Sequence, residues 1–151
     1  MQPRCVSSEL RVATVNLAHG RGDGAHQALK RPSVLKSNLH KIGRWLAEVD
    51  ADLACLQEAD APSWWSGRFD HVAAVAKPAG HGFRSHTKHV DRVGLHYGTA
   101  LTSKAELVDC VAHTFAPTPP TFSKGFTLAA RTWPGDEGFV FDVVSLHTDF
   151  A

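Results

Sequence analysis

The chain has 151 residues, of which 43% are hydrophobic and 21% are charged, and its formal net charge is +1 at pH 7. This composition excludes a disordered, collagenous or low-complexity chain and predicts one soluble domain with a packed core. A net charge so close to zero also lacks the basic footprint that drives non-specific nucleic-acid binding, which argues against a processive nucleic-acid enzyme.

The first part of the chain has the pattern of a strand, a helix and a second strand. Residues 10–17 mix β-branched and apolar residues and run into a glycine-rich turn, which predicts a strand. In residues 34–49 the apolar residues recur at steps of four and three, as in an amphipathic helix, and Ser33 is the expected N-cap. Residues 53–56 form a short apolar run without alternation, which is typical of a strand covered on both faces. A strand–helix–strand unit of this kind predicts that the two strands are parallel.

The remainder is predicted to consist of short strands and loops. Residues 71–76 are expected to form a strand, and residues 77–94, which are rich in Gly and His, a long exposed loop. Further strands are predicted at residues 97–103, 105–111, 126–133 and 139–147. The last two flank a Pro-Gly-Asp-Glu-Gly turn, which is the clearest hairpin signal in the sequence.

Three polar residues stand at the ends of segments that should be buried strands. Asn16 ends the first strand, Glu58 comes two residues after the apolar run, and His147 ends the last strand. Ligands gather at the carboxyl ends of strands in open α/β sheets, because loops there carry polar groups on a rigid support. An amide, a carboxylate and an imidazole at one edge suit a hard divalent cation and a phosphate. Taken singly, each of these residues also fits a solvated or turn position.

The densest group of imidazole and cationic side chains lies in and just after the loop predicted at residues 77–94. Its members are His81, His86, His89, His96, Arg84, Lys88 and Arg92. Their spacing matches no zinc motif, which favours a solvated loop. The alternatives are a loop on the substrate side that contacts anionic groups, and a transition-metal site that depends on His86 and His89.

Four segments form an ordered set along the chain: RVATVNLAHG, ADLACLQEAD, YGTALTSK and VVSLHTDF. In this order and at roughly this spacing, they resemble the endonuclease/exonuclease/phosphatase superfamily, which includes DNase-I-like nucleases, neutral sphingomyelinases and inositol-phosphate phosphatases. The most specific of them is the LQE motif that ends in Glu58. The resemblance spans nearly the whole chain and implies an α/β fold, the N-terminal portion of a four-layer α/β/β/α sandwich of the DNase-I-like type.

The resemblance also implies roles for individual residues. Glu58 is expected to be a ligand of Mg²⁺, with Mn²⁺ as the alternative ion. Asn16 is expected beside the metal and the substrate phosphate, as a metal-site and catalytic residue. His147 is expected to donate a hydrogen bond to the scissile phosphate during in-line attack by water. His19 is expected to support this site, and Asp149 either to orient His147 or to cap the strand.

The activity implied by the resemblance is Mg²⁺-dependent hydrolysis of a phosphodiester or a phosphomonoester. Nucleic acid, a phospholipid head group and a sugar phosphate all stay open as substrates, because loops decide substrate choice in this fold. The alternative is a non-catalytic domain of the same fold that binds a phosphate ligand or a protein. The presence of Glu58 favours the enzyme, since nothing in a binding domain requires a carboxylate at that position.

The chain departs from the family pattern in two mild ways and one larger way. Thr148 stands where Leu is usual, and Lys124 stands where Arg is frequent. The G-D-x-N and S-D-H motifs that supply the family's water-activating groups are absent from the 151 residues. Residues 1–151 are therefore expected to be the N-terminal part of one longer domain, with little or no activity as they stand. These residues are expected to supply one sheet and one long helix, and a second sheet is expected from the missing part.

The cysteines and the apolar segments bear on the location of the protein. Cys5, Cys55 and Cys110 are odd in number and form no C-x-x-C pair, so neither a disulfide framework nor a zinc ribbon is expected. A reducing, cytoplasmic location is predicted. No stretch resembles the apolar core of a signal peptide, and no run approaches the roughly 20 apolar residues of a transmembrane segment.

Overall fold

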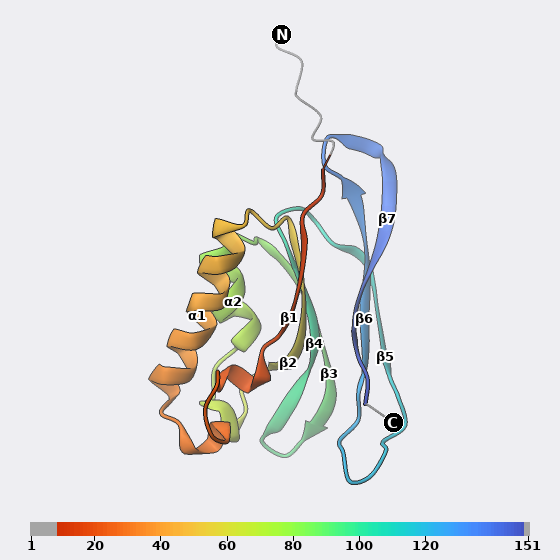
Figure 1. Ribbon diagram of the computed structural model, residues 1–151. Helices are drawn as coiled ribbons and strands as arrows, with labels where there is room; N and C mark the ends of the chain where they lie inside the picture. Colours follow the sequence, from red (N-terminus) through yellow and green to blue (C-terminus); the bar gives the residue numbers. More distant parts are fainter. Residues whose placement is uncertain (1–8, 150–151) are drawn as a thin grey trace.

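The computed structural model describes residues 9–149, which form two β-sheets packed face to face, with helices on the outer side of one of them (Figure 1). The first sheet has the strand order β1-β2-β4-β3, and the second has the order β5-β6-β7. The strands are β1 Val12–Asn16, β2 Leu53–Asp60, β3 Phe83–Arg92, β4 Leu95–Ser103, β5 Val108–Thr114, β6 Gly125–Trp133 and β7 Asp136–His147. The helices are α1 Pro32–Glu48 and α2 His71–Ala79, with short 3₁₀ helices η1 Ala18–Gly20, η2 Gln27–Leu29 and η3 Trp64–Ser66.

The strand–helix–strand unit of β1, α1 and β2 is confirmed. The two strands pair in parallel, and the helix between them buries Leu39 and Leu46 against the first sheet. The prediction that Ser33 caps the helix is wrong, because Arg31 is the N-cap and Pro32 occupies the first helical turn. Proline suits that position, since its φ is already helical and the N–H that it lacks would have no partner there.

The strand predicted at residues 71–76 is wrong, because this segment begins helix α2. Asp70 caps the helix, and its carboxylate accepts a hydrogen bond from the backbone N–H of Ala73. Val72 and Val75 lie three residues apart, on the same helical face, and are buried in the core against the first sheet. A short apolar run does not distinguish a buried helix from a strand, which is why the sequence pattern was ambiguous here.

The exposed loop predicted at residues 77–94 is also wrong over most of its length. Phe83–Arg92 forms β3, which pairs antiparallel with β4. The two strands approach closely at Gly98, where an added Cβ would lie 1.9 Å from the carbonyl oxygen of Thr87. Because β3 is an edge strand of the first sheet, it carries many polar and charged residues, which hide the strand pattern.

The strand β2 is covered on both faces, as its unbroken apolar run predicts. Ala54 and Leu56 lie in the core between the first sheet and the helices. Leu53 and Cys55 point the other way and pack against the second sheet, where Val143 lies. The side chains of Leu53, Ala54 and Leu56 are fully buried, and Cys55 is 7% exposed. The core therefore has two layers, one on each side of β2.

The second sheet comes from this chain, so the expectation that a missing part supplies it is wrong. The hairpin predicted at residues 126–133 and 139–147 is confirmed as β6 and β7, and it forms this sheet together with β5. The outer face of the second sheet is the one that stays apolar and uncovered, with Val111, Val144 and Leu146 exposed by 53%, 44% and 49%. The sequence had instead predicted that the uncovered apolar face belongs to the first sheet.

The part of the chain that the structure describes contains two free cysteines, buried Cys55 and exposed Cys110, whereas Cys5 lies outside it. Burial raises the pKa of the Cys55 thiol to about 11, so this thiol is protonated and unreactive at neutral pH. Among residues 9–149, neither α1 nor α2 nor a 3₁₀ helix has the length and hydrophobicity that a membrane-spanning helix needs.

Helices α1 and α2 approach each other most closely at Gly43. An added Cβ would lie 2.4 Å from both the Cγ of Pro78 and the carbonyl oxygen of Val75. We expect Gly43→Ala to lower the free energy of unfolding by about 1–2 kcal/mol, because separating the helices outweighs the helical propensity of Ala. Urea unfolding followed by circular dichroism measures this change. Gly82→Ala is the matched control, since its Cβ would meet no atom within 4 Å, and equal effects of both variants would contradict the explanation.

Candidate active site at the carboxyl ends of β1, β2 and β7

Glu58 lies in an irregular part of β2. The register of β2 against β4 shifts between Leu56 and Ala59, which marks a β-bulge. The backbone of Glu58 has a φ of 48°, a left-handed conformation that costs a non-glycine residue on the order of 1–2 kcal/mol. A bulge re-aims the side chain that it carries, and the Glu58 side chain is 21% exposed at the sheet edge.

Positive φ values recur at this edge. Of the six described non-glycine residues with a positive φ, Ala18 at 46°, His19 at 53° and Glu58 at 48° lie together here. Strained conformations of this kind persist only where the surrounding structure enforces them, and they concentrate at functional sites. The backbone therefore marks this edge independently of side-chain chemistry.

Asn16 and His147 both lie against Glu58, so the convergence expected from three strand ends is present. The Nδ2 of Asn16 donates a hydrogen bond of 3.1 Å to the Oε1 of Glu58, and the Nε2 of His147 is 3.8 Å from the same oxygen. The Oδ1 of Asn16 accepts a hydrogen bond of 2.8 Å from the N–H of Ala18. Asn16 thus uses both ends of its amide to fix the loop after β1 against the Glu58 carboxylate.

His19 joins the same edge from the short helix η1. Its Nδ1 is 2.6 Å from the Oδ1 of Asp60, and its Nε2 is 3.5 Å from the Oε2 of Glu58. Asp60 is fully buried, and its second oxygen accepts a hydrogen bond of 2.8 Å from the Nε1 of Trp65. The expectation that His19 reaches this edge is met. The sequence reasoning missed Asp60, although it stands two residues past Glu58 in the same motif.

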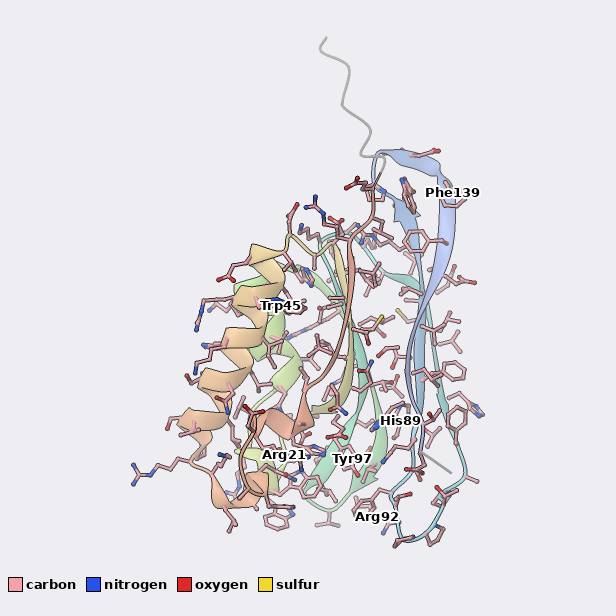
Figure 2. The ribbon with its side chains drawn as sticks, viewed as in Figure 1. Arg21, Trp45, His89, Arg92, Tyr97 and Phe139 are labelled. Atoms are coloured by element: carbon pink, nitrogen blue, oxygen red, sulfur yellow. The ribbon has the colours of Figure 1, made fainter. Side chains whose placement is uncertain are left out.

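An aromatic wall closes one side of the site. The rings of Trp65 and Tyr97 stack with centroids 5.5 Å apart, and the His19 ring lies 4.9 Å and 4.8 Å from them. Burial, with Asp60 and Glu58 nearby, raises the pKa of the Tyr97 phenol, which therefore stays protonated. Figure 2 shows Tyr97 and Arg21 at the same end of the molecule. Tyr97 begins the YGTALTSK segment, whose contribution to the site the sequence reasoning also missed.

The basic side chains nearest to the Glu58 carboxylate are the imidazoles of His19 and His147. Within residues 9–149, no Lys or Arg lies within ion-pair distance of this carboxylate, whereas Asp50 and Asp149 face Lys104 and Lys124. Burial, reinforced by Lys124, lowers the pKa of His147 below its ordinary value. A neutral His147 does not offset the charge of the neighbouring carboxylate, which favours a bound cation.

The donor set at Glu58 fits a hard cation that keeps much of its water. The described part of the chain has no group of three or more His, Cys, Asp or Glu that could hold a metal ion, so a closed site of the structural zinc type is not found there. Mg²⁺ needs fewer protein ligands, since it is usually bound through one or two carboxylates, several waters and the substrate's phosphates. The partly exposed carboxylate of Glu58 supplies such a donor.

A cleft of about 550 Å³ opens directly beside Asn16. Its walls are the glycine-rich loop after β1 and the first half of α1, and they carry Arg21, Lys30 and Lys41. None of these three cations is within ion-pair distance of a described carboxylate; Asp23 also lies on the wall. The cleft carries three basic side chains and lies next to the Glu58 carboxylate. This arrangement suits a ligand with two anionic groups, one that binds a metal held by Glu58 and one that binds the basic side chains.

Asp149 bonds to residues of the segment between β5 and β6. Its carboxylate accepts hydrogen bonds from the hydroxyls of Thr118 and Thr121 and lies 3.6 Å from the Nζ of Lys124. The two hydroxyls, with Lys124, hold the pKa of Asp149 below its ordinary value. Asp149 therefore fastens the chain after β7 to the loop between β5 and β6, and no hydrogen bond joins it to His147 in the described region.

The histidines expected in an exposed loop are separate residues, most of them internal. His81 bonds to Thr102 and Ala51, His86 to Ala59, His89 to Thr99 and Thr114, and His96 to Asp91. The proposed transition-metal site is therefore wrong for the described residues, where no such ligand group occurs. His86 instead supports the site indirectly, because its Nε2 bonds to the carbonyl of Ala59 at the bulge that carries Glu58.

The sequence matches a known protein family, and the fold is similar to those of solved structures. The Endonuclease/Exonuclease/phosphatase family matches residues 13–140. An endonuclease/exonuclease/phosphatase family protein from Leptotrichia buccalis C-1013-b has a TM-score of 0.58 and 15% identity, over 93% of this chain and 54% of that one. An endonuclease/exonuclease/phosphatase from Beutenbergia cavernae DSM 12333 has a TM-score of 0.52 and 16% identity, over 89% of this chain and 36% of that one. No curated protein gives a significant match.

The likeness to these solved structures concerns the fold. Two packed sheets with helices outside the first sheet form an α/β architecture of the DNase-I-like type, as expected from the sequence. This chain spans about half of the first structure and about a third of the second.

Proposed function

The chain belongs to the endonuclease/exonuclease/phosphatase family, and on this premise we propose that the protein hydrolyses phosphate esters with the help of Mg²⁺ bound at Glu58. The observation that carries this proposal is the state of Glu58, which has a φ of 48°, contacts Asn16 and His147, and has no Lys or Arg within ion-pair distance among residues 9–149. A domain that only binds a protein or a phosphate has no need of a strained carboxylate without a Lys or Arg partner. Because the chain spans 54% and 36% of the two solved structures, the proposal concerns the full gene product.

Each residue at the edge has a distinct task in the proposed reaction. Glu58 holds the cation, and Asn16 fixes the orientation of the carboxylate. Bound Mg²⁺ supplies positive charge against the negative charge that builds on the phosphate during attack by water. His147 donates a hydrogen bond to a phosphate oxygen. His19, held by Asp60, keeps the second oxygen of Glu58 in place.

The cleft beside Asn16 supports an anionic substrate. Arg21, Lys30 and Lys41 line it without acidic partners in the described region, so they are available to an anionic group next to the reacting phosphate. Nucleic acid, phospholipid head groups and sugar phosphates all bring phosphate chemistry to this cleft.

Hydrolysis of a chromogenic phosphodiester tests the proposal. The full gene product is expected to release p-nitrophenolate from bis(p-nitrophenyl) phosphate or from p-nitrophenyl phosphate in the presence of Mg²⁺, and to stop when EDTA removes the metal. An equal rate in EDTA, or no release from either substrate, would reject the proposed function in favour of a binding domain.

His147→Ala is expected to lower kcat by about 10²–10³-fold with a smaller change in KM. The physical reason is that a hydrogen bond to the phosphate strengthens as negative charge develops in the transition state. Steady-state kinetics of the same chromogenic substrate measures both constants. His113→Ala, at an exposed position of β5, is the control and should retain the wild-type rate. A kcat for His147→Ala within about threefold of that control would remove His147 from the mechanism.

A further inference from the structure

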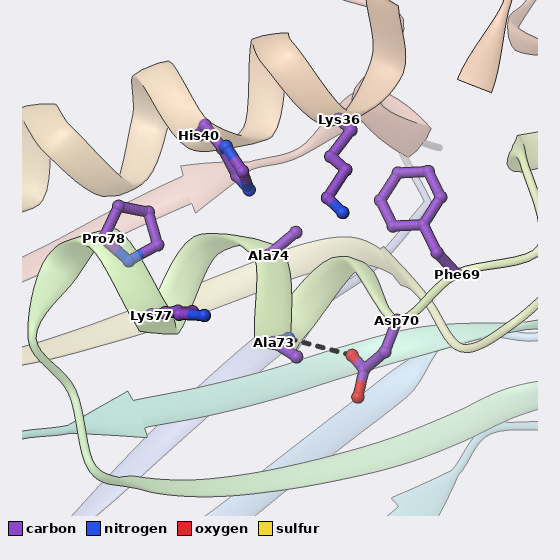
Figure 3. A pocket seen from close by; sticks show the side chains of 8 residues that line it. All are labelled: Lys36, His40, Phe69, Asp70, Ala73, Ala74, Lys77 and Pro78. Atoms are coloured by element: carbon purple, nitrogen blue, oxygen red, sulfur yellow. Dashed lines mark hydrogen bonds between the residues drawn. The ribbon is translucent and has the colours of Figure 1, made fainter. Parts of the chain in front are cut away.

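A second cavity lies on the helical side of the first sheet, between helices α1 and α2. Its volume is about 600 Å³, which is within the range of about 300–1,000 Å³ of small-molecule sites. Figure 3 shows the side chains that line it, with Lys36 and His40 reaching from α1 across to residues on and beside α2. None of its lining residues belongs to the edge that carries Glu58.

Packing of the two helices creates this groove. They are closest at Gly43, where an added Cβ would meet Val75 and Pro78 at 2.4 Å. One turn away, α2 offers only Ala73 and Ala74 to the opposite helix, so space remains between them. The helices are anchored below by buried residues of the same core, which makes the groove a fixed feature of the fold.

The floor and one end of the groove are apolar. Ala74 is 7% exposed, and Pro78 stands at the narrow end. Phe69 stands at the other end, and its ring packs against that of His71 with centroids 4.6 Å apart. Because Phe69 lines the groove, its ring is within reach of an aromatic ring bound there.

The rim of the groove is cationic. Lys36 and His40 point from α1 toward α2 (Figure 3), and Lys77 lines the groove from α2. No described acidic side chain is within ion-pair distance of these three residues. Asp70 is the one acid on the lining. Its carboxylate is already used, since it caps α2 through Ala73 and lies 3.5 Å from Arg84.

We propose that this groove binds a small aromatic anion, a planar apolar body with one carboxylate, sulfonate or phosphate group. The body lies on Ala73 and Ala74 and stacks on Phe69, and the anionic group lies between Lys36 and Lys77. Charge complementarity selects this class, because two unpaired ammonium groups over an apolar floor favour a ligand with one charged end. The site is separate from the phosphoesterase edge and stands whether or not that activity is found.

Titration of the full chain with 2-naphthoate tests the site by two-dimensional NMR. Saturable shifts are expected at amides of α1 and α2 around Lys36, Ala73 and Lys77, with a Kd on the order of 0.1–1 mM for a ligand of this size. The neutral analogue 2-naphthalenemethanol is expected to bind about tenfold more weakly. Because the outer face of the second sheet is also apolar, the position of the shifts separates the groove from that face.

Two variants and one control complete the test. The double variant Lys36→Gln/Lys77→Gln keeps the apolar stems and is expected to weaken 2-naphthoate binding about tenfold. Ala73→Phe, at a partly exposed position of α2, fills the floor and should abolish the shifts while the far-UV circular dichroism is kept. Arg44→Gln, at an exposed position of α1 outside both clefts, should bind as wild type. Shifts centred on β5–β7, or an unchanged Kd in the double variant, would overturn the proposal.

Discussion

Glu58→Gln is expected to lower kcat/KM for phosphoester hydrolysis by the full gene product by at least about 100-fold. The amide keeps the size of the side chain and can still face Asn16, but it removes the negative charge that holds the cation. Loss of a charge that acts on the reacting phosphate commonly costs about 3 kcal/mol or more of transition-state stabilisation. The measurement is the initial rate with bis(p-nitrophenyl) phosphate at saturating Mg²⁺.

The matched control for this variant is Glu48→Gln, which removes the same charge at the exposed end of α1. This variant should retain the wild-type rate, since Glu48 is at the end of α1 that lies away from the site. Thermal unfolding of both variants checks that the fold is kept. If Glu58→Gln were as active as Glu48→Gln, the site described here would have no part in the reaction.

The second large effect concerns stability in acid and arises from internal histidines. His89 lies between the two sheets, as Figure 2 shows, and is 7% exposed, with Nδ1 bonded to Thr114 and Nε2 to Thr99. Burial lowers the pKa of His89 to about 4. His71, His81 and His86 also have pKa values that burial lowers. In each case the folded protein favours the neutral ring.

The sign of the effect follows from proton binding. Unfolded histidine has a pKa near 6.5, so between pH 6.5 and about 4 the unfolded chain binds protons that the folded chain does not. Stability is therefore present above pH 6.5 and is lost as the pH falls. For His89 the gap from 6.5 to about 4 corresponds to at most about 3 kcal/mol, which is a large part of the total stability of an ordinary domain.

Urea unfolding at several pH values between 7 and 4.5 measures this loss. His89→Gln is expected to be less stable than wild type at pH 7, because Gln cannot make both hydrogen bonds, but to lose less stability on acidification. His40→Gln, on α1, should follow the wild-type pH dependence. A pH dependence of His89→Gln that matches wild type would show that His89 does not take part.

The strand–helix–strand unit was predictable because its signals are local. The apolar stripe of α1 indicates a helix with one buried face. The unbroken apolar run of β2 indicates a strand that is buried on both faces. By contrast, α2 was mistaken for a strand, since nothing local shows that Val72 and Val75 share one helical face. β3 was mistaken for a loop because, as an edge strand, it carries many polar residues. Only its pairing with β4, across the turn at Gly94, identifies it as a strand.

The site was predictable in part for the same reason. Asn16 and His147 each end a recognisable strand, and Glu58 comes two residues after a recognisable apolar run, so parallel pairing and sheet packing bring them together. Asp60 and Tyr97 were missed because their roles depend on contacts between segments: Asp60 bonds to His19, 41 residues away. The bulge that turns Glu58 has no sequence signature of its own, and His86 supports it from a strand that the sequence did not reveal.

The Mg²⁺ concentration that gives half-maximal hydrolysis is the most direct measurement of the central claim, that Glu58 holds the cation. It should be compared between wild type, Glu58→Asp and His147→Ala in the full gene product. Glu58→Asp keeps the charge but shortens its reach, so its half-maximal Mg²⁺ concentration is expected to rise about tenfold or more. His147→Ala is expected to lose rate without changing that concentration. An unchanged Mg²⁺ requirement in Glu58→Asp, or hydrolysis independent of Mg²⁺, would contradict the account.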